Sequence, residues 1–217
     1  MQTDLVKSRK VLFSYLRRNV RPESVIAAME RVPRERFVPA ESRHMAYLDL
    51  PLNIGDGQTI SQPYIVALMV AALGLQNQDK VLEVGTGSGY QAAILSLLVP
   101  QGRVFTVELV PHLADRARNL LQKLGYDNVR VGQAGSDLGC PDQAPFNAII
   151  VAAASPKLPK SLVSQLAVGG RLLIPVGTLD QQELVQAIRT NEGVSVSMMG
   201  PCRFVPLIGR EAFPKLP

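Results

Sequence analysis

Residues 81–90 combine the residue types and the spacing of a ligand-binding loop. A short, mostly apolar run, residues 80–84, leads into glycines at alternate positions, Gly85, Gly87 and Gly89. Glycine permits a tight turn and removes the side chain where the backbone must approach a ligand. A helix that begins after the loop would add the amide groups of its first turn. The stretch therefore predicts a buried strand, a binding loop and a helix.

Two acids accompany this loop. Glu83 precedes the glycines, and Glu108 ends the next apolar run, where a carboxylate can accept hydrogen bonds from ribose hydroxyls. The spacing G-x-G-x-G differs from the G-x-G-x-x-G of dinucleotide sites, and no phosphate-binding lysine follows it. The pattern is typical of methyltransferases that bind S-adenosylmethionine, with Glu83 at the amino-acid end of the cofactor. A plainer interpretation stays open, in which the glycines only form a turn and Glu108 is a solvated strand end.

A sheet must position these residues, because strand and helix patterns alternate from residue 80 onward. We expect strands at 80–84, 103–108, 129–132, 146–152, 171–176, 183–190 and 194–199, with a further candidate at 202–208. We expect helices at 5–20, 24–32, 63–75, 91–98, 111–124 and 159–166, with residues 33–58 extended and rich in turns. The pattern predicts an α/β fold with a doubly wound, mostly parallel sheet and antiparallel C-terminal strands.

Single residues are expected to bound some of these elements. Ser61 is a predicted N-cap of the helix at 63–75, and Gly74 lies near the end of that helix. Gly169 and Gly170 are expected to form a turn into the strand that follows them.

Composition limits the class of protein. The chain has 217 residues, 47% hydrophobic and 19% charged, with a net charge of +5, as in ordinary globular proteins. The basic residues are scattered and no apolar run approaches the length of a membrane span, so we expect neither a nucleic-acid partner nor a membrane. Two cysteines, Cys140 and Cys202, suit a reducing compartment. We expect a cytoplasmic monomer without a bound metal.

We expect one domain over residues 1–217, with an N-terminal helical and substrate-loop segment (1–78), a cofactor-binding core (79–177) and C-terminal strands (178–217).

Five segments resemble the protein-L-isoaspartate O-methyltransferase family. They are residues 31–38 (RVPRERFV), 46–63 (AYLDLPLNIGDGQTISQP), 85–89 (GTGSG), 169–177 (GGRLLIPVG) and 203–207 (RFVPL). The resemblance covers nearly the whole chain in the right order. The part QTISQP is specific to this family, whereas the glycine loop is shared by many methyltransferases.

The resemblance implies a Rossmann-like S-adenosylmethionine-dependent methyltransferase fold with an N-terminal helical extension. Such enzymes transfer a methyl group from S-adenosylmethionine to the α-carboxylate of L-isoaspartyl residues in damaged proteins and peptides, and release S-adenosylhomocysteine. The ester collapses to a succinimide, which hydrolyses partly to normal aspartate. Because a carboxylate is already ionised at neutral pH, its methylation needs alignment rather than a strong base.

The resemblance also assigns the site. Ser61 is the active-site residue, and we expect it to orient the substrate carboxylate. The expected cofactor-binding residues, from the loop and from the resemblance, are Gln58, Thr59, Ile60, Ser61, Glu83, Gly85, Thr86, Gly87, Gly89, Glu108, Leu109, Ala134 and Gly135. The expected substrate-binding residues are Ile60, Ser61, Phe204, Val205 and Pro206. Asp49 and Asp56 are interpreted as turn residues, with a role at the substrate as the alternative.

One position departs from the family pattern. Members usually carry Gly-Asp-Gly after the third strand, with the aspartate at the adenine, whereas the matching residues here are Gln133, Ala134 and Gly135. We expect weaker cofactor binding, with Asp137 or Gln133 as the substitute acceptor. The departure keeps two alternatives open: a non-catalytic relative that binds the cofactor or isoaspartyl peptides, and a methyltransferase for a dedicated peptide or small molecule.

Overall fold

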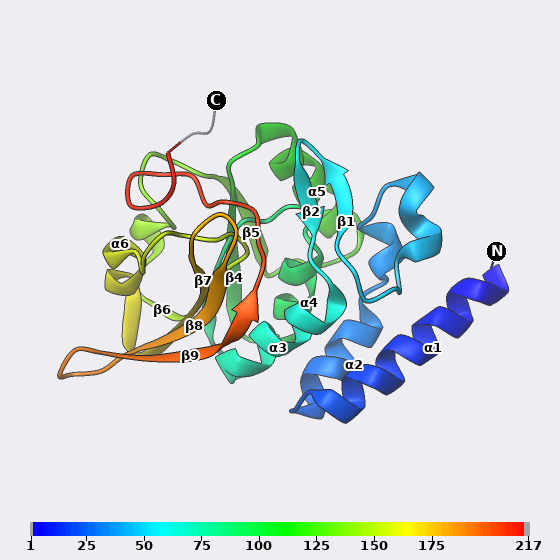
Figure 1. The fold of residues 1–217 in the computed structure, drawn as a ribbon, viewed down its shortest axis with the longest axis horizontal. Coiled ribbons are helices and arrows are strands. Elements are labelled where there is room, and N and C mark those ends of the chain that lie inside the picture. Colours follow the sequence, from blue (N-terminus) through cyan, green and yellow to red (C-terminus); the bar gives the residue numbers. More distant parts are fainter. Residues whose placement is uncertain (1, 215–217) are drawn as a thin grey trace.

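The structure is a computed structural model that describes residues 2–214. A seven-stranded sheet forms its centre (Figure 1). The strand order is β5-β4-β3-β6-β7-β8-β9. The first five strands in this order are parallel, and β8 and β9 are each antiparallel to the preceding strand. The strands are β3 Lys80–Val84, β4 Arg103–Glu108, β5 Val129–Gln133, β6 Phe146–Val151, β7 Leu166–Gly177, β8 Gln182–Arg189 and β9 Val194–Cys202. The predicted α/β class with antiparallel C-terminal strands is confirmed.

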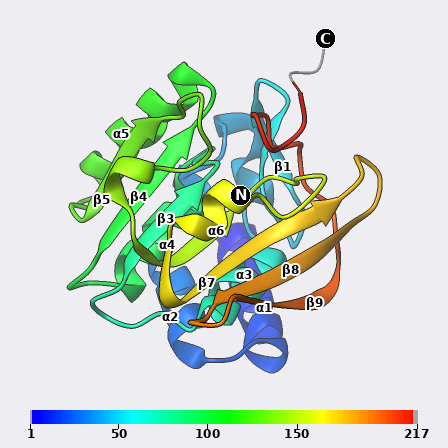
Figure 2. The same cartoon turned by 90° about the vertical axis from the view of Figure 1, so that its left-hand side faces the viewer.

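Helices pack on both faces of this sheet, as Figures 1 and 2 show together. The α-helices are α1 Gln2–Asn19, α2 Glu23–Arg31, α3 Pro63–Leu73, α4 Tyr90–Leu98, α5 Pro111–Lys123 and α6 Lys160–Ser164. Short 3-10 helices are η1 Arg34–Arg36, η2 Ala40–Met45 and η3 Pro141–Gln143. Within the described residues, no helix is long and apolar enough to cross a membrane.

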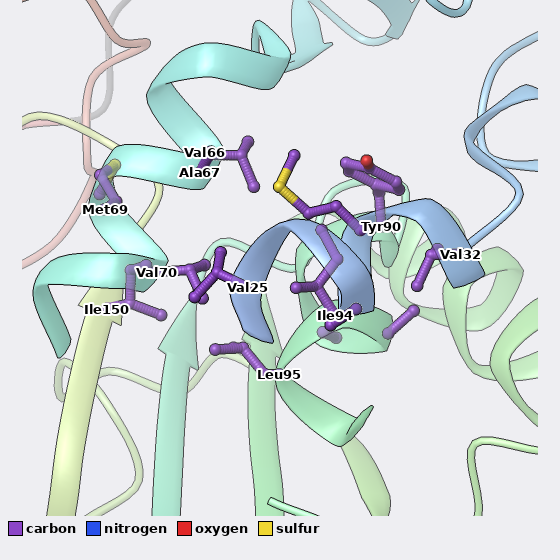
Figure 3. Packing of buried hydrophobic residues seen from close by; sticks show 14 of the residues in the cluster. Val25, Val32, Val66, Ala67, Met69, Val70, Tyr90, Ile94, Leu95 and Ile150 are labelled. Atoms are coloured by element: carbon purple, nitrogen blue, oxygen red, sulfur yellow. The ribbon is translucent and has the colours of Figure 1, made fainter. Parts of the chain in front are cut away.

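The alternation of side chains along the parallel strands divides the core into two clusters. In β3, Val81 belongs to the cluster that includes residues of α1 to α4, whereas Leu82 belongs to the cluster that includes Leu162 of α6. Both side chains are fully buried, because a parallel strand is covered on both faces. Figure 3 shows part of the first cluster, where side chains of α2, α3 and α4 meet above the sheet, with Tyr90 among them.

The segment between α2 and α3 is more ordered than its prolines and glycines predicted. It contains η1 and η2 and then a small antiparallel hairpin, β1 Leu52–Gly55 and β2 Gln58–Ile60. Asp56 adopts a positive φ of 54° at the tip of this hairpin, so its interpretation as a turn residue is confirmed. The hairpin lies beside α5 (Figure 1), where His112 contacts Asp56 and Arg116 donates to the carbonyl of Ile54.

Three predictions about the C-terminal elements are wrong. The helix expected at 159–166 ends at Ser164, and β7 begins already at Leu166. The glycines at 169 and 170 lie inside this strand, at an irregularity between the pairs Phe146–Leu166 and Ala148–Arg171. The candidate strand at 202–208 does not form: Cys202 ends β9, and the residues after it make only the isolated bridges Pro206–Ala154 and Ile208–Phe213.

Candidate active site

A cavity opens at the carboxyl ends of the parallel strands. Its volume is about 1040 Å³ when the open space at its mouth is included. Val84, Glu108 and Ala152, at or just after the ends of β3, β4 and β6, line it together with residues 58–61 of the hairpin segment. This is the position at which open α/β sheets bind their ligands.

The glycine loop forms one wall of this cavity in a conformation that requires glycine. Gly85, Gly87 and Gly89 have φ angles of 96°, 52° and 87°. The amides of Gly85 and Thr86 both donate to the carbonyl of Val107, and the amide of Gly89 donates to the carbonyl of Thr86. These amides are therefore not free to hold a pyrophosphate, which disfavours a dinucleotide and favours a ligand without phosphate.

Glu83 lies at the bottom of the cavity and is fully buried. Its carboxylate accepts hydrogen bonds from Thr106 Oγ1 at 2.5 Å and from Gln91 Nε2 at 3.0 Å. Thr86 Oγ1 lies 2.6 Å from Thr106 Oγ1 and extends this chain to the loop. Burial raises the pKa of the Glu83 carboxyl to about 8, although both hydrogen bonds oppose the rise. Among the described residues no Lys, Arg or His forms an ion pair with Glu83, so a cationic ligand would favour its ionised form.

Glu108 is fixed at the end of β4 by the backbone of the loop. Its Oε2 accepts from the amide of Gly87 at 2.8 Å, and its Oε1 accepts from the amide of Val110 at 3.0 Å. The carboxylate is 6% exposed and lines the cavity. Each oxygen retains a lone pair, so the side chain can still accept hydroxyl hydrogen bonds from a ligand.

The charges around the cavity fit S-adenosylmethionine. Among its described lining residues, Glu83, Glu108 and Asp137 are acidic, and none is Lys, Arg or His. A cation with an α-ammonium group and a sulfonium complements this set, and a ribose can use the lone pairs of Glu108. Leu109 and Leu138 add apolar wall for a base. The residues present therefore fit this cofactor.

Ser61 lies between this cavity and a second one. It lines both, as do Thr59, Ala152 and Val205. The second cavity, about 1410 Å³ with its open mouth, is also lined by Phe204 and by apolar residues of α3 such as Ile65. Ligands in either cavity would therefore have access to Ser61.

The predicted N-cap role of Ser61 is wrong. The residue that precedes α3 is Gln62, and no side chain of its own caps the helix. Asp49, which is distant in sequence, takes this role: its Oδ1 accepts from the amide of Tyr64 at 2.8 Å and its Oδ2 from Gln62 Nε2 at 3.2 Å. The hydroxyl of Ser61 is thereby left available for another partner.

The structure brings together most of the site residues that the sequence suggested. All expected cofactor residues line the first cavity except Gly89, which packs on α5 with Leu121 and Ala117 close to the position a Cβ would take. Of the expected substrate residues, Phe204 lines only the second cavity. Further residues that were not expected from the sequence also line the first cavity, namely Val66, Val84, Ser88, Tyr90, Gln91, Val107, Val110, Leu138, Gly139, Ala152, Ala153, Leu207 and Ile208. The positions directly after β6 could have been expected from the strand-end rule, whereas Leu207 and Ile208 gave no local signal.

The structure distinguishes the two residues, Asp137 and Gln133, that were expected to replace the missing hydrogen-bond acceptor for the adenine. Asp137 lines the cavity, and its Oδ1 lies 3.7 Å from Arg210 Nη1. Gln133 does not line it; its Nε2 donates to the carbonyls of Glu108 and Leu109 at 2.9 and 2.7 Å. Asp137 is therefore the better placed acceptor of the two.

Comparisons with known proteins agree with this geometry. The model of the family "Protein-L-isoaspartate(D-aspartate) O-methyltransferase (PCMT)" matches residues 7–212. A protein-L-isoaspartate O-methyltransferase 1 from Syntrophobacter fumaroxidans is 50% identical over 204 residues, 94% of each chain. A protein-L-isoaspartate O-methyltransferase from Ignicoccus hospitalis is 51% identical over 194 residues, 88% of this chain and 92% of its own.

Solved structures with the same fold carry related descriptions. One described as a protein-L-isoaspartate O-methyltransferase has a TM-score of 0.85 and 28% identity over 94% of this chain and 67% of its own. A second, from Plasmodium falciparum and in complex with S-adenosyl-L-homocysteine, has a TM-score of 0.80 and 26% identity over 91% and 96% of the two chains. By sequence, fold and site, the chain belongs to the protein-L-isoaspartate(D-aspartate) O-methyltransferase family.

Proposed function

We propose that the chain methylates the α-carboxylate of L-isoaspartyl residues in damaged proteins and peptides, with S-adenosylmethionine as the methyl donor and S-adenosylhomocysteine as the product. The observation that carries the proposal is the position of Ser61 between the acidic cavity and the second cavity. The first cavity suits the cofactor and the second suits an extended peptide. The reacting carboxylate would lie where the two meet.

Each wall of the first cavity has a proposed role. Glu83 and its hydrogen-bonded neighbours receive the amino-acid end of the cofactor, and Glu108 receives the ribose hydroxyls. Gln58, Thr59 and Ile60 cover the cofactor from the hairpin segment, and the apolar residues around Ala134 face the base. When bound, S-adenosylmethionine would supply an electrophilic methyl group for transfer to a substrate carboxylate oxygen, with S-adenosylhomocysteine as the leaving group.

Ser61 is proposed to orient the substrate rather than to act as a nucleophile. Its hydroxyl can donate to one carboxylate oxygen and leave the other oxygen directed at the methyl group. No histidine lines either cavity in the described part of the chain. The absence of such a base suits this substrate, because the carboxylate is already ionised at neutral pH. Most of the rate enhancement would then come from alignment.

The second cavity is proposed as the peptide groove. Phe204 and Val205 would form one side of it, and residues of α3 such as Tyr64 and Leu68 the other, while Pro206 lines the first cavity. We also propose that the protein acts as a monomer. Its two part-buried free cysteines suit the cytoplasm. Light scattering coupled to size exclusion would test the monomer.

Chromatography of a single peptide tests the repair reaction. An isoaspartyl peptide is incubated with the protein and S-adenosylmethionine, and the isoaspartyl and aspartyl forms are separated over time. Repair predicts that the isoaspartyl peak falls while the aspartyl peak grows, because each cycle of methylation and succinimide hydrolysis yields some aspartate. A constant isoaspartyl peak, with S-adenosylhomocysteine binding demonstrated by calorimetry, would instead support a non-catalytic relative.

A further inference from the structure

Arg34 is a fully buried cation that the proposed chemistry does not use. It lies in η1, directly after α2, and is 0% exposed. Within the described part of the chain it forms no ion pair, and it lines neither cavity. Burying a guanidinium without an acidic partner is costly, and arginine is seldom found in this state. Its contacts should therefore reveal what it contributes.

Two of these contacts join the ends of one segment. Arg34 Nε donates to the carbonyl of Ala46 at 2.8 Å, and Arg34 Nη2 donates to the carbonyl of Ser61 at 2.9 Å. Residues 46–61 contain the β1–β2 hairpin and the part QTIS that lines the cofactor cavity. One planar guanidinium therefore closes this segment at its base and holds the main chain of Ser61 directly.

A third contact connects Arg34 to the cofactor side. Its guanidinium carbon lies 4.8 Å from the centre of the Tyr90 ring. Tyr90 is the first residue of α4, follows the glycine loop and lines the first cavity. Figure 3 shows its ring among side chains of α2, α3 and α4. Arg34 thus lies between the segment that carries Ser61 and the helix that follows the glycine loop.

The hydrogen bonds of Arg34 indicate a role beyond filling the core, because two of its nitrogens bind carbonyls and the third is left unpaired among the described residues. Arg34 Nη1 is shielded from solvent, and none of the residues that the structure describes forms a hydrogen bond with it. An arginine that only filled the core would be replaceable by an apolar side chain of similar volume, often at no cost in stability. The two carbonyl bonds are what such a replacement could not supply.

We propose that Arg34 is a positioning residue that fixes the main chain of Ser61 relative to Tyr90, so that the Ser61 hydroxyl meets the substrate carboxylate in line with the cofactor. The inference rests on the proposed function, in which Ser61 orients that carboxylate. Arg34 acts through Ser61, since it touches neither cavity. Lysine cannot replace it, because one ammonium group cannot span the carbonyls of Ala46 and Ser61 with the same geometry.

A double-mutant cycle tests this dependence on Ser61. The turnover of an isoaspartyl peptide is measured in wild type, R34K, S61A and R34K/S61A, and S-adenosylhomocysteine affinity is measured by calorimetry. R171K is the matched control, because Arg171 lines neither cavity and its Nε is also buried without a partner. R34Q serves as a second variant at the same position.

The expected result is non-additivity. R34K should lower kcat by about tenfold or more in wild type, since small misplacements are expensive in alignment-driven catalysis. It should cause less than about a twofold change in S61A, where no hydroxyl remains to be misplaced, with cofactor affinity and R171K both near wild type.

An equal loss in both backgrounds, an unchanged kcat, or a loss that follows cofactor affinity would overturn the inference. It would also be overturned if neither R34K nor R34Q bound S-adenosylhomocysteine, because Arg34 would then be needed for folding itself. Failure of the proposed function would look different, since wild type would then be inactive or S61A fully active.

Discussion

The amide of Gly87 donates to the Glu108 carboxylate at 2.8 Å, across the gap between the glycine loop and the end of β4. The two features that suggested a cofactor site in the sequence are thus bonded to each other. The loop orients the acid, and the acid in turn holds the loop at a glycine with positive φ. A ligand that binds Glu108 would therefore depend on the conformation of the glycine loop, because the loop holds the carboxylate in place.

Replacing Glu108 by glutamine should weaken cofactor binding. The backbone amides of Gly87 and Val110 both donate to Glu108, so the side-chain NH2 of glutamine would face one of these two donors. The ribose would also lose a charged hydrogen-bond acceptor. We expect S-adenosylhomocysteine affinity to fall about 10- to 100-fold, from a loss of about 1.5–3 kcal/mol. Calorimetry with D115N, which removes an exposed acid of α5, as the control would measure it. Equal affinities of E108Q and D115N would remove Glu108 from the site.

The buried carboxyl of Glu83 should make stability depend on pH. Its pKa is about 8 in the folded protein and near 4.5 in the unfolded chain, so the folded state retains a proton between these values that the unfolded state has lost. The contribution of Glu83 to stability therefore becomes less favourable as pH rises from about 4.5 to about 8. In E83Q this titration is absent. The Tm of cofactor-free E83Q relative to wild type should rise across that window and level off above it; a constant difference from pH 5 to 9 would contradict the assignment.

On the adenine side, Asp137 should contribute to binding and Gln133 should not. Asp137 lines the cavity, whereas the amide nitrogen of Gln133 is engaged by two backbone carbonyls. We expect D137N to weaken S-adenosylhomocysteine binding several-fold and Q133A to leave it unchanged. Restoring the usual family residue, as A134D, should tighten binding by about tenfold if the carboxylate regains its bond. Tighter binding in A134D together with no effect of D137N would show that nothing substitutes for the missing aspartate.

Gly89 should be important for stability rather than for binding. Its φ is 87°, and an added Cβ would lie 3.2 Å from a methyl group of Leu121, but the residue does not line the cavity. G89A should cost about 1–3 kcal/mol through backbone strain and crowding. Gly125 offers a matched control, with φ 79° and nothing within 4 Å of an added Cβ. Thermal unfolding should rank G89A below G125A, with cofactor affinity retained in both; a stable G89A that fails to bind would reverse this assignment.

The sequence predicted the centre of the fold well because its signals there are local. The strand Lys80–Val84, the glycine turn and α4 follow one another, so apolar runs and glycines mark each boundary. Errors arose where partners distant in sequence decide the structure. Ser61 was the expected N-cap, but the Asp49 carboxylate accepts from the amide of Tyr64 at the helix start. Gly169 was expected in a turn, but Leu166 and Arg171 on either side of it pair with β6, so it lies within β7. Leu207 and Ile208 reach the cavity only through the tertiary fold.

Methyl transfer to a matched pair of peptides distinguishes isoaspartyl repair from the other candidate functions. Radiolabelled S-adenosylmethionine is supplied with an isoaspartyl peptide or with the same peptide containing normal aspartate, and ester formation is counted before hydrolysis. We expect label in the isoaspartyl peptide, almost none in its aspartyl twin, and a large loss of label in S61A. Equal labelling of both peptides, or no labelling by a protein that binds S-adenosylhomocysteine, would contradict isoaspartyl repair.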